Sequence, residues 1–196
     1  MPLSGPILGN LIFLEMSGQG FTGSKMLQLS SAIGLGTINN IQATNFYQGT
    51  STGIGTGAGV GTGFVTGIVG PVVGSLIYAE MLGQGLTGSK SLQLANSIGN
   101  AFSSHISSGI VNSTSSPVCS GTGIGKLQGI VGQAIGMSIF SMMGAFTLTG
   151  SKSLNLALSI GAGIANAFSG AIVTTVITGA GYPPSPLTGI DVGKLM

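Results

Sequence analysis

The chain has 196 residues, enough for one domain with a sizeable hydrophobic core. Only 4% of its residues are charged and 37 are glycine, and five lysines against three acidic residues give a net charge of +2. This charge is too sparse for the clustered cations that nucleic-acid binding needs. It is also unlike the charged surface of a free soluble monomer, so we expect partner subunits or lipid to cover part of the surface.

Residues that carry metal or covalent chemistry are scarce. Cys119 is the one cysteine and has no disulfide partner in the chain. His105 is the one histidine, with no Cys, Asp or Glu near it in sequence, so we interpret it as a packed or surface residue. The sequence predicts no cofactor, no metal site and no catalytic centre. Its first residues also lack the basic region of a secretory signal.

The chain is organised around an internal repeat. A motif ending in Thr-Gly-Ser-Lys occurs three times, at 18–25, 83–90 and 145–152, and successive lysines are 65 and then 62 residues apart. The third copy is the divergent one, since Met142 stands where the earlier copies have glutamate. We predict three repeats within one compact domain, with the boundaries 1–64, 65–126 and 127–196.

Each motif follows an apolar segment that predicts a first helix of about 11 to 13 residues. These segments are 6–16, 71–82 and 133–143. Pro6 and Pro71 suit the first turn of such a helix, and Gly18 and Gly83 suit its end.

Apolar residues three and four apart follow each motif and predict a second helix of about 18 to 25 residues. The stripes are Leu29, Ile33, Ile38, Ile41; Leu94, Ile98, Phe102, Ile106, Ile110; and Leu156, Ile160, Ile164, Phe168, Ile172, Val176. The third copy repeats the pattern of residues 97–103 at 159–169 with four extra residues. Four residues are close to one helical turn, which predicts a longer helix with its faces kept in place.

The segments behind the second helices are rich in glycine and threonine, and we predict extended loops there: 49–63, 107–125 and 178–193. The predicted fold is therefore all-α, with three tandem helical hairpins in a pseudo-threefold arrangement. Glycines four apart on the first helices predict close approach of helix backbones. They are Gly5, Gly9, Gly70, Gly74, Gly132 and Gly136, and Gly34, Gly99 and Gly161 align on the second helices.

Thr-Gly-Ser-Lys is interpreted as the turn of each hairpin. Thr22, Thr87 and Thr149, or the serines two residues later, are predicted to cap the second helix by accepting a backbone N–H. The stretch 18–25 also approaches the phosphate-binding pattern Gly-x-x-x-x-Gly-Lys-Ser, but its serine and lysine are exchanged, and an apolar helix precedes it in place of a strand. Nucleotide binding is therefore a remote alternative.

Glu15 with Lys25, and Glu80 with Lys90, are predicted to form structural ion pairs that close a hairpin or bridge neighbouring repeats. Each glutamate approaches a helix C-terminus and each lysine a helix N-terminus, where the macrodipole disfavours the charge, so each needs a compensating partner. Lys152 has no glutamate in its own repeat and must find its partner elsewhere.

A mean hydropathy of +0.61 favours a membrane-inserting, holin-like or pore-forming protein as one function class. The first helices argue against it, because about 20 apolar residues are needed to span a bilayer. The sequence favours instead a place inside a larger assembly, with membrane contact left open.

The glycine-rich chain without arginine or tryptophan, with its threefold repeat, resembles small structural virion proteins of contractile-tailed bacteriophages, such as those near a baseplate or tail tip. The resemblance implies a non-enzymatic structural component located in a virion. Its partners would be other structural proteins or copies of itself. The resemblance assigns no role to individual residues.

Overall fold

The computed structural model describes residues 3–44, 46–54, 59–116, 120–169, 171–180 and 186–195. Within them, the order helix, helix, strand, strand occurs three times in succession. The elements are α1 (Gly5–Gly18), α2 (Ser24–Thr44), β1 (Phe46–Ile54), β2 (Gly59–Thr66), α3 (Gly70–Gly83), α4 (Ser89–Ser108), β3 (Ile110–Ser116), β4 (Ser120–Gln128), α5 (Gly132–Ala145), α6 (Ser153–Ser169), β5 (Ile172–Ala180) and β6 (Pro186–Leu195). Cys119 lies outside the described residues.

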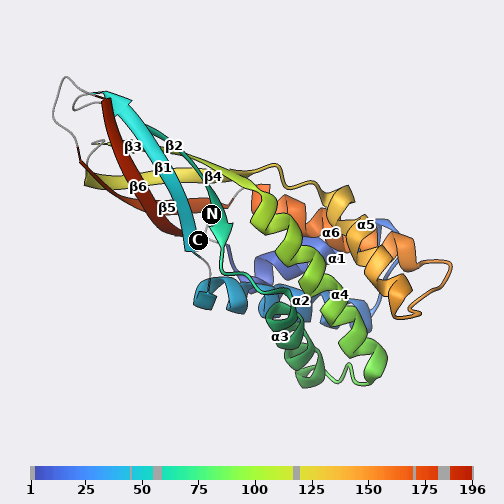
Figure 1. Cartoon of the computed structure of the whole chain (residues 1–196). Helices are drawn as coiled ribbons and strands as arrows, with labels where there is room; N and C mark the ends of the chain where they lie inside the picture. Colours follow the sequence, from blue (N-terminus) through green and yellow to red (C-terminus); the bar gives the residue numbers. More distant parts are fainter. Residues whose placement is uncertain are drawn as a thin grey trace.

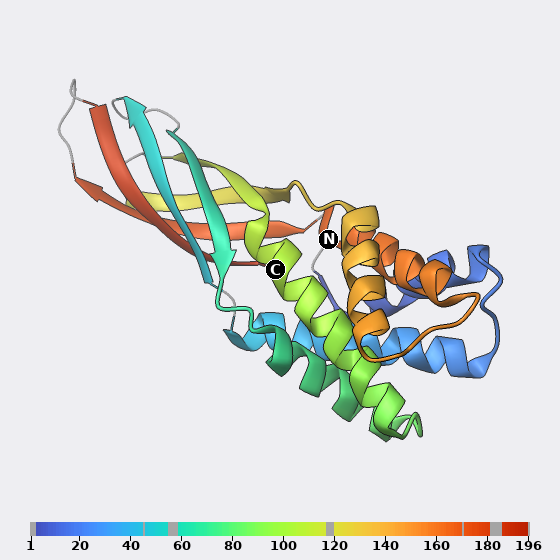
Figure 2. The same ribbon diagram turned by 45° about the vertical axis from the view of Figure 1, so that its right-hand side comes forward.

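The helices form a closed ring at one end of an elongated molecule (Figure 1). Each helix packs against its neighbours in sequence, and α6 packs against α1 to close the ring. The strands form the other end, so the chain passes between the two ends after every second element (Figure 2).

The strands form a closed antiparallel barrel. Each pairs with the next in sequence, and β6 pairs with β1. In the hairpin of β3 and β4, Val111 lies opposite Leu127, and in that of β5 and β6, Val173 lies opposite Leu195. Closure leaves no unpaired strand edge in the barrel.

The all-α prediction is confirmed only in part, because the predicted helices are present but the segments expected to be loops are these strands. The structure is mostly helical with an antiparallel sheet. Along β2, Val60, Thr62 and Phe64 are exposed whereas Gly61 and Gly63 are buried. A barrel of so few strands has a narrow interior. Gly61 and Gly63 on β2 and Gly125 on β4 face this interior, whereas β3 contains no glycine.

The predicted first helices are confirmed as α1, α3 and α5, and the predicted second helices as α2, α4 and α6, but the second helices end earlier than expected. Ile110 belongs to β3, and Ile172 and Val176 belong to β5. The predicted extra turn is also wrong, since α6 has 17 residues and α4 has 20. Four fewer residues follow the insertion, so Gly-Ile-Val at 109–111 and Ala-Ile-Val at 171–173 are again 62 apart.

The core lies inside the helix ring and continues into the near end of the barrel through Val65, Val111, Leu127 and Val173. Aligned positions of the three motif copies occupy it together. On the first helices these are Leu8, Val73, Ile135; Ile12, Ile77, Ile139; and Met16, Met81, Met143. Burying such side chains supplies the main stabilisation, roughly 1.5–3 kcal/mol for each.

One core position differs strongly between the copies. Thr37 on α2 aligns with Phe102 on α4 and Ile164 on α6, and all three are fully buried. The Phe102 ring packs against that of Phe168, with 5.3 Å between centroids. The Oγ1 of Thr37 is buried without a hydrogen-bond partner in the described part of the chain.

Candidate functional site

The three hairpin turns lie together at the end of the helix ring that faces away from the barrel (Figures 1 and 2). In the first, Gly20 has a φ of +80° and donates its N–H to Ser17, and Phe21 donates to Met16. These two bonds define a Schellman motif, which ends a helix on a left-handed residue. Gly18, predicted to be that residue, is instead the last residue of α1.

The other two turns have the same geometry. Gly85 donates to Leu82 and Leu86 to Met81, while Thr147 donates to Gly144 and Leu148 to Met143. Phe21, Leu86 and Leu148 all pack against the core, which is the apolar contact that accompanies this motif. The N–H groups of Gly20 and Phe21, which a phosphate would require, are thus already bonded to α1.

Thr147 is the exception among these residues. Its φ is +57°, whereas the aligned Gly20 and Gly85 have +80° and +75°. A β-branched residue is strained in this region. Thr147 is the non-glycine residue with a positive φ in the described part of the chain.

The predicted threonine cap of the second helix is wrong for α4. Its N-cap is Gly88, with a φ of +113° and no side-chain cap, and Thr87 is exposed. Gly88 O accepts the N–H groups of Ser91 and Leu92. Gly23 has a φ of +100° and accepts in the same way at the start of α2. The glycine, which tolerates this φ, therefore occupies the position expected for a capping side chain.

The structure gives both glutamates other partners than the predicted lysines. Glu15 on α1 accepts a hydrogen bond from Asn166 on α6, with 3.0 Å between Oε1 and Nδ2. Glu80 on α3 accepts one from Asn39 on α2, at 3.4 Å. These bonds join neighbouring hairpins. This pairing had a signal in the sequence that was missed, since both asparagines lie 14 residues after a motif lysine.

The three motif lysines are exposed. Within the described residues Lys25 and Lys90 have no ion pair, and Lys152 lies over the ring of Phe21 with 5.8 Å between Nζ and the centroid. The leucine two residues after each lysine is exposed as well: 47% for Leu27, 38% for Leu92 and 36% for Leu154.

Glycine contacts hold the two helices of each hairpin close. A Cβ on Gly34 would lie 2.5 Å from Gly9 N and also clash with Gly5 O. One on Gly99 would lie 2.5 Å from Gly70 O. One on Gly161 would lie 2.5 Å from Gly136 N and also clash with Gly132 O. Each second helix thus places a glycine between the two glycines of the first helix.

Neighbouring hairpins also meet through glycine, with one exception. A Cβ on Gly36 would lie 2.5 Å from Ile77 Cα on α3, and one on Gly163 would lie 2.5 Å from Ile12 Cα on α1. The aligned residue at the contact between α4 and α5 is Ala101. These two helices contact each other less extensively than the other neighbours in the ring.

The contact between α4 and α5 also has its own polar residues. Ser104 aligns with the two asparagines, and Met142 aligns with the two glutamates. His105 Nε2 instead lies 2.9 Å from Ser138 Oγ. His105 is therefore half-buried and joins α4 to α5 through this polar contact.

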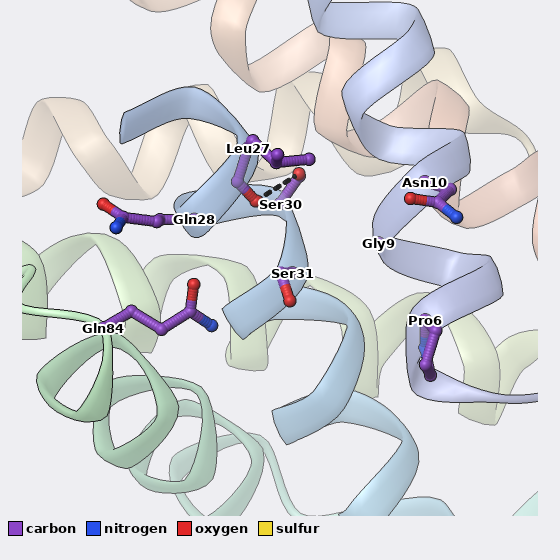
Figure 3. Close-up of a pocket in the computed structure, with 8 residues that line it drawn as sticks. All are labelled: Pro6, Gly9, Asn10, Leu27, Gln28, Ser30, Ser31 and Gln84. Carbon is purple, nitrogen blue, oxygen red and sulfur yellow. Dashed lines mark hydrogen bonds between the residues drawn. The ribbon is translucent and has the colours of Figure 1, made fainter. Parts of the chain in front are cut away.

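A pocket of about 340 Å³ lies between α1 and α2 (Figure 3). Its walls carry small residues and amides: Pro6, Gly9, Asn10, Leu27, Gln28, Ser30, Ser31 and Gln84. Ser30 Oγ donates to Leu27 O, and Gln28 Oε1 is buried without a partner among the described residues. Ser30 and Ser31 bring hydroxyl groups to the pocket, and the residues that line it include no acidic or basic side chain to activate them.

The described residues contain no group of three or more His, Cys, Asp or Glu side chains placed to hold a metal ion. No helix in the same part of the chain combines the length and apolar character needed to cross a membrane. Comparisons with protein-family models, curated proteins and solved structures found no match.

Proposed function

We propose that this protein is a non-enzymatic structural component of a large assembly, where it occupies the axis of a three- or sixfold environment. The three units predicted from the sequence, 1–64, 65–126 and 127–196, would be related by a pseudo-threefold axis. That axis would run through both the helix ring and the barrel, because each unit contributes two helices to one and two strands to the other.

The observation that carries the proposal is this double closure within one chain. A homotrimer forms such an axis from three chains of identical sequence, so its three contacts must be identical. A single triplicated chain has the same overall shape as a homotrimer. One copy can therefore occupy a unique position on the axis of a symmetric partner.

The residues common to the three motif copies support a structural role. The glycines set helix ends and helix contacts, and the aligned apolar residues fill one core. The outer surface meanwhile exposes large apolar residues on the barrel, among them Val60, Phe64, Ile110 and Ile124. Apolar residues gathered on a surface with so little charge favour contact with other proteins. A bacteriophage virion, at a tail or baseplate, is the assembly that we propose.

The test is the state of the native protein in its source. The proposal expects the chain to co-sediment with a large particle, at one copy for every three or six copies of a neighbouring protein, measured by quantitative mass spectrometry. Recovery as a free species, or equal copy numbers with every neighbour, would contradict it. Retention in the membrane fraction after an alkaline carbonate wash would favour the membrane-inserting alternative instead.

A further inference from the structure

Three residues recur at the turn end of the helix ring with their side chains exposed. Each motif keeps a threonine, the lysine three residues later and a leucine two residues after that. The threonines are exposed, and Gly88 rather than Thr87 stands at the N-cap of α4. The exposed threonine and lysine side chains persist in all three copies without a hydrogen bond or ion pair inside the described part of the chain, which points to an external contact.

The lysines are placed where the fold itself disfavours them. Lys25 and Lys90 lie in the first turn of α2 and α4, where the partial positive charge of the helix N-terminus opposes another cation. The carboxylates of Glu15 and Glu80 accept hydrogen bonds from asparagines and do not compensate them. The turn end thus carries three exposed cations, of which Lys152 lies over the Phe21 ring, and none of them has a carboxylate partner among the described residues.

The leucines add an apolar component on a different side. Residues two apart on a helix point to nearly opposite sides, so Leu27 and Leu92 face away from the side of Lys25 and Lys90. A partner that contacted both the lysines and the leucines could not lie flat against the end of the ring. Such a partner would have to surround the end of the ring.

We propose that the turn end of the helix ring docks into a socket on the threefold axis of a homo-oligomeric protein. Each copy of the partner presents one carboxylate to a motif lysine and an apolar wall to a motif leucine. Charge complementarity selects this occupant, since the end offers three like cations at three like positions. The inference rests on the proposed function, and it adds which end binds and by what chemistry.

Zero-length cross-linking of the native particle with a carbodiimide tests the socket directly. This reagent joins a lysine to a carboxylate only when the two are in contact. The inference expects Lys25, Lys90 and Lys152 each to become linked to the same carboxylate residue of one partner protein. Lys126, exposed on the barrel strand β4, is the matched control and is expected to give no such link.

The outcomes separate this inference from the function it rests on. A chain that sits in a particle at the expected ratio, but whose motif lysines link to different proteins or to none, would overturn the socket and leave the structural role standing. A chain that sediments alone would overturn both.

Variants provide a second measurement, incorporation into the particle in competition with the wild-type chain. Because surface charge pairs contribute little singly, each of Lys25→Gln, Lys90→Gln and Lys152→Gln is expected to lower incorporation by roughly two- to fivefold, and the triple variant by roughly 10- to 100-fold. Lys126→Gln should leave it unchanged. If one lysine variant alone accounted for the whole loss of incorporation, a threefold socket would be refuted. The thermal midpoint of each free variant is the control, and an unchanged midpoint excludes misfolding.

Discussion

Replacing Thr147 by glycine should stabilise the protein, although it removes a side chain. Thr147 holds a φ of +57° at the position where the other two turns have glycine. Its side chain is exposed and has no hydrogen bond among the described residues, so only the backbone contributes to the difference.

The magnitude follows from two opposing effects. A left-handed conformation costs a non-glycine residue about 1–2 kcal/mol. Glycine in turn loses about 0.5–1 kcal/mol more conformational freedom on folding. Thr147→Gly should therefore raise the free energy of unfolding by about 0.5–1 kcal/mol. For a chain of this size, that raises the thermal midpoint by about 1–4 °C.

Thermal unfolding followed by circular dichroism measures the change, and the second turn supplies a matched control. Gly85→Thr reverses the substitution at the aligned position, where an added Cβ would meet nothing within 4 Å. It should lower the midpoint by a similar amount. If Thr147→Gly lowered the midpoint, or if both variants left it unchanged, the argument that the left-handed conformation strains Thr147 would be refuted.

Three further substitutions test the packing. Gly99→Ala should cost about 3 kcal/mol in unfolding free energy, because its Cβ would meet the α3 backbone, whereas Gly83→Ala, with open space around it, should cost nothing measurable in the same urea titration. Thr37→Val should stabilise by about 1 kcal/mol, since it keeps the shape and removes an unsatisfied hydroxyl; a destabilised variant would show that this hydroxyl has a partner. Glu80→Gln should cost less than about 1 kcal/mol, and Asn39→Ala in the same chain should add little to that loss, because the two residues share one bond.

The helices could be predicted because their signals are local. Pro6 and Pro71 mark the first turns, and the apolar spacing continues over enough residues to exclude a strand. The glycines of the helix contacts were identified for the same reason, since spacing of four places them on one face. Which carbonyl or amide each would meet depends on the partner helix and could not be predicted.

The barrel was missed because its pattern is inverted. A half-buried strand usually alternates apolar residues inside with polar residues outside. On β2 the inside positions are Gly61 and Gly63, while Val60 and Phe64 point outward. Glycine in a strand interior normally weakens it and is typical of loops. Only closure into a narrow barrel makes glycine the fitting inward residue, and closure depends on pairing between residues far apart in sequence, such as Thr52 with Thr188, 136 residues later.

The glutamates were predicted to pair with the motif lysines, within a hairpin or between repeats, yet they accept hydrogen bonds from asparagines of neighbouring hairpins. The contact between α4 and α5 shows why the two residues of such a hydrogen bond are replaced together. If Met142 stood opposite an asparagine at position 104, that asparagine would have no acceptor. If Ser104 stood opposite a glutamate at position 142, that carboxylate would lose its amide donor. In a homotrimer any such change would appear at all three contacts at once. Within one chain it is confined to one contact, where Ala101 replaces the glycine and the hydrogen bond between His105 and Ser138 replaces the bond between asparagine and glutamate. The chain can thus keep three like ends for a symmetric partner while one side of its ring differs from the other two.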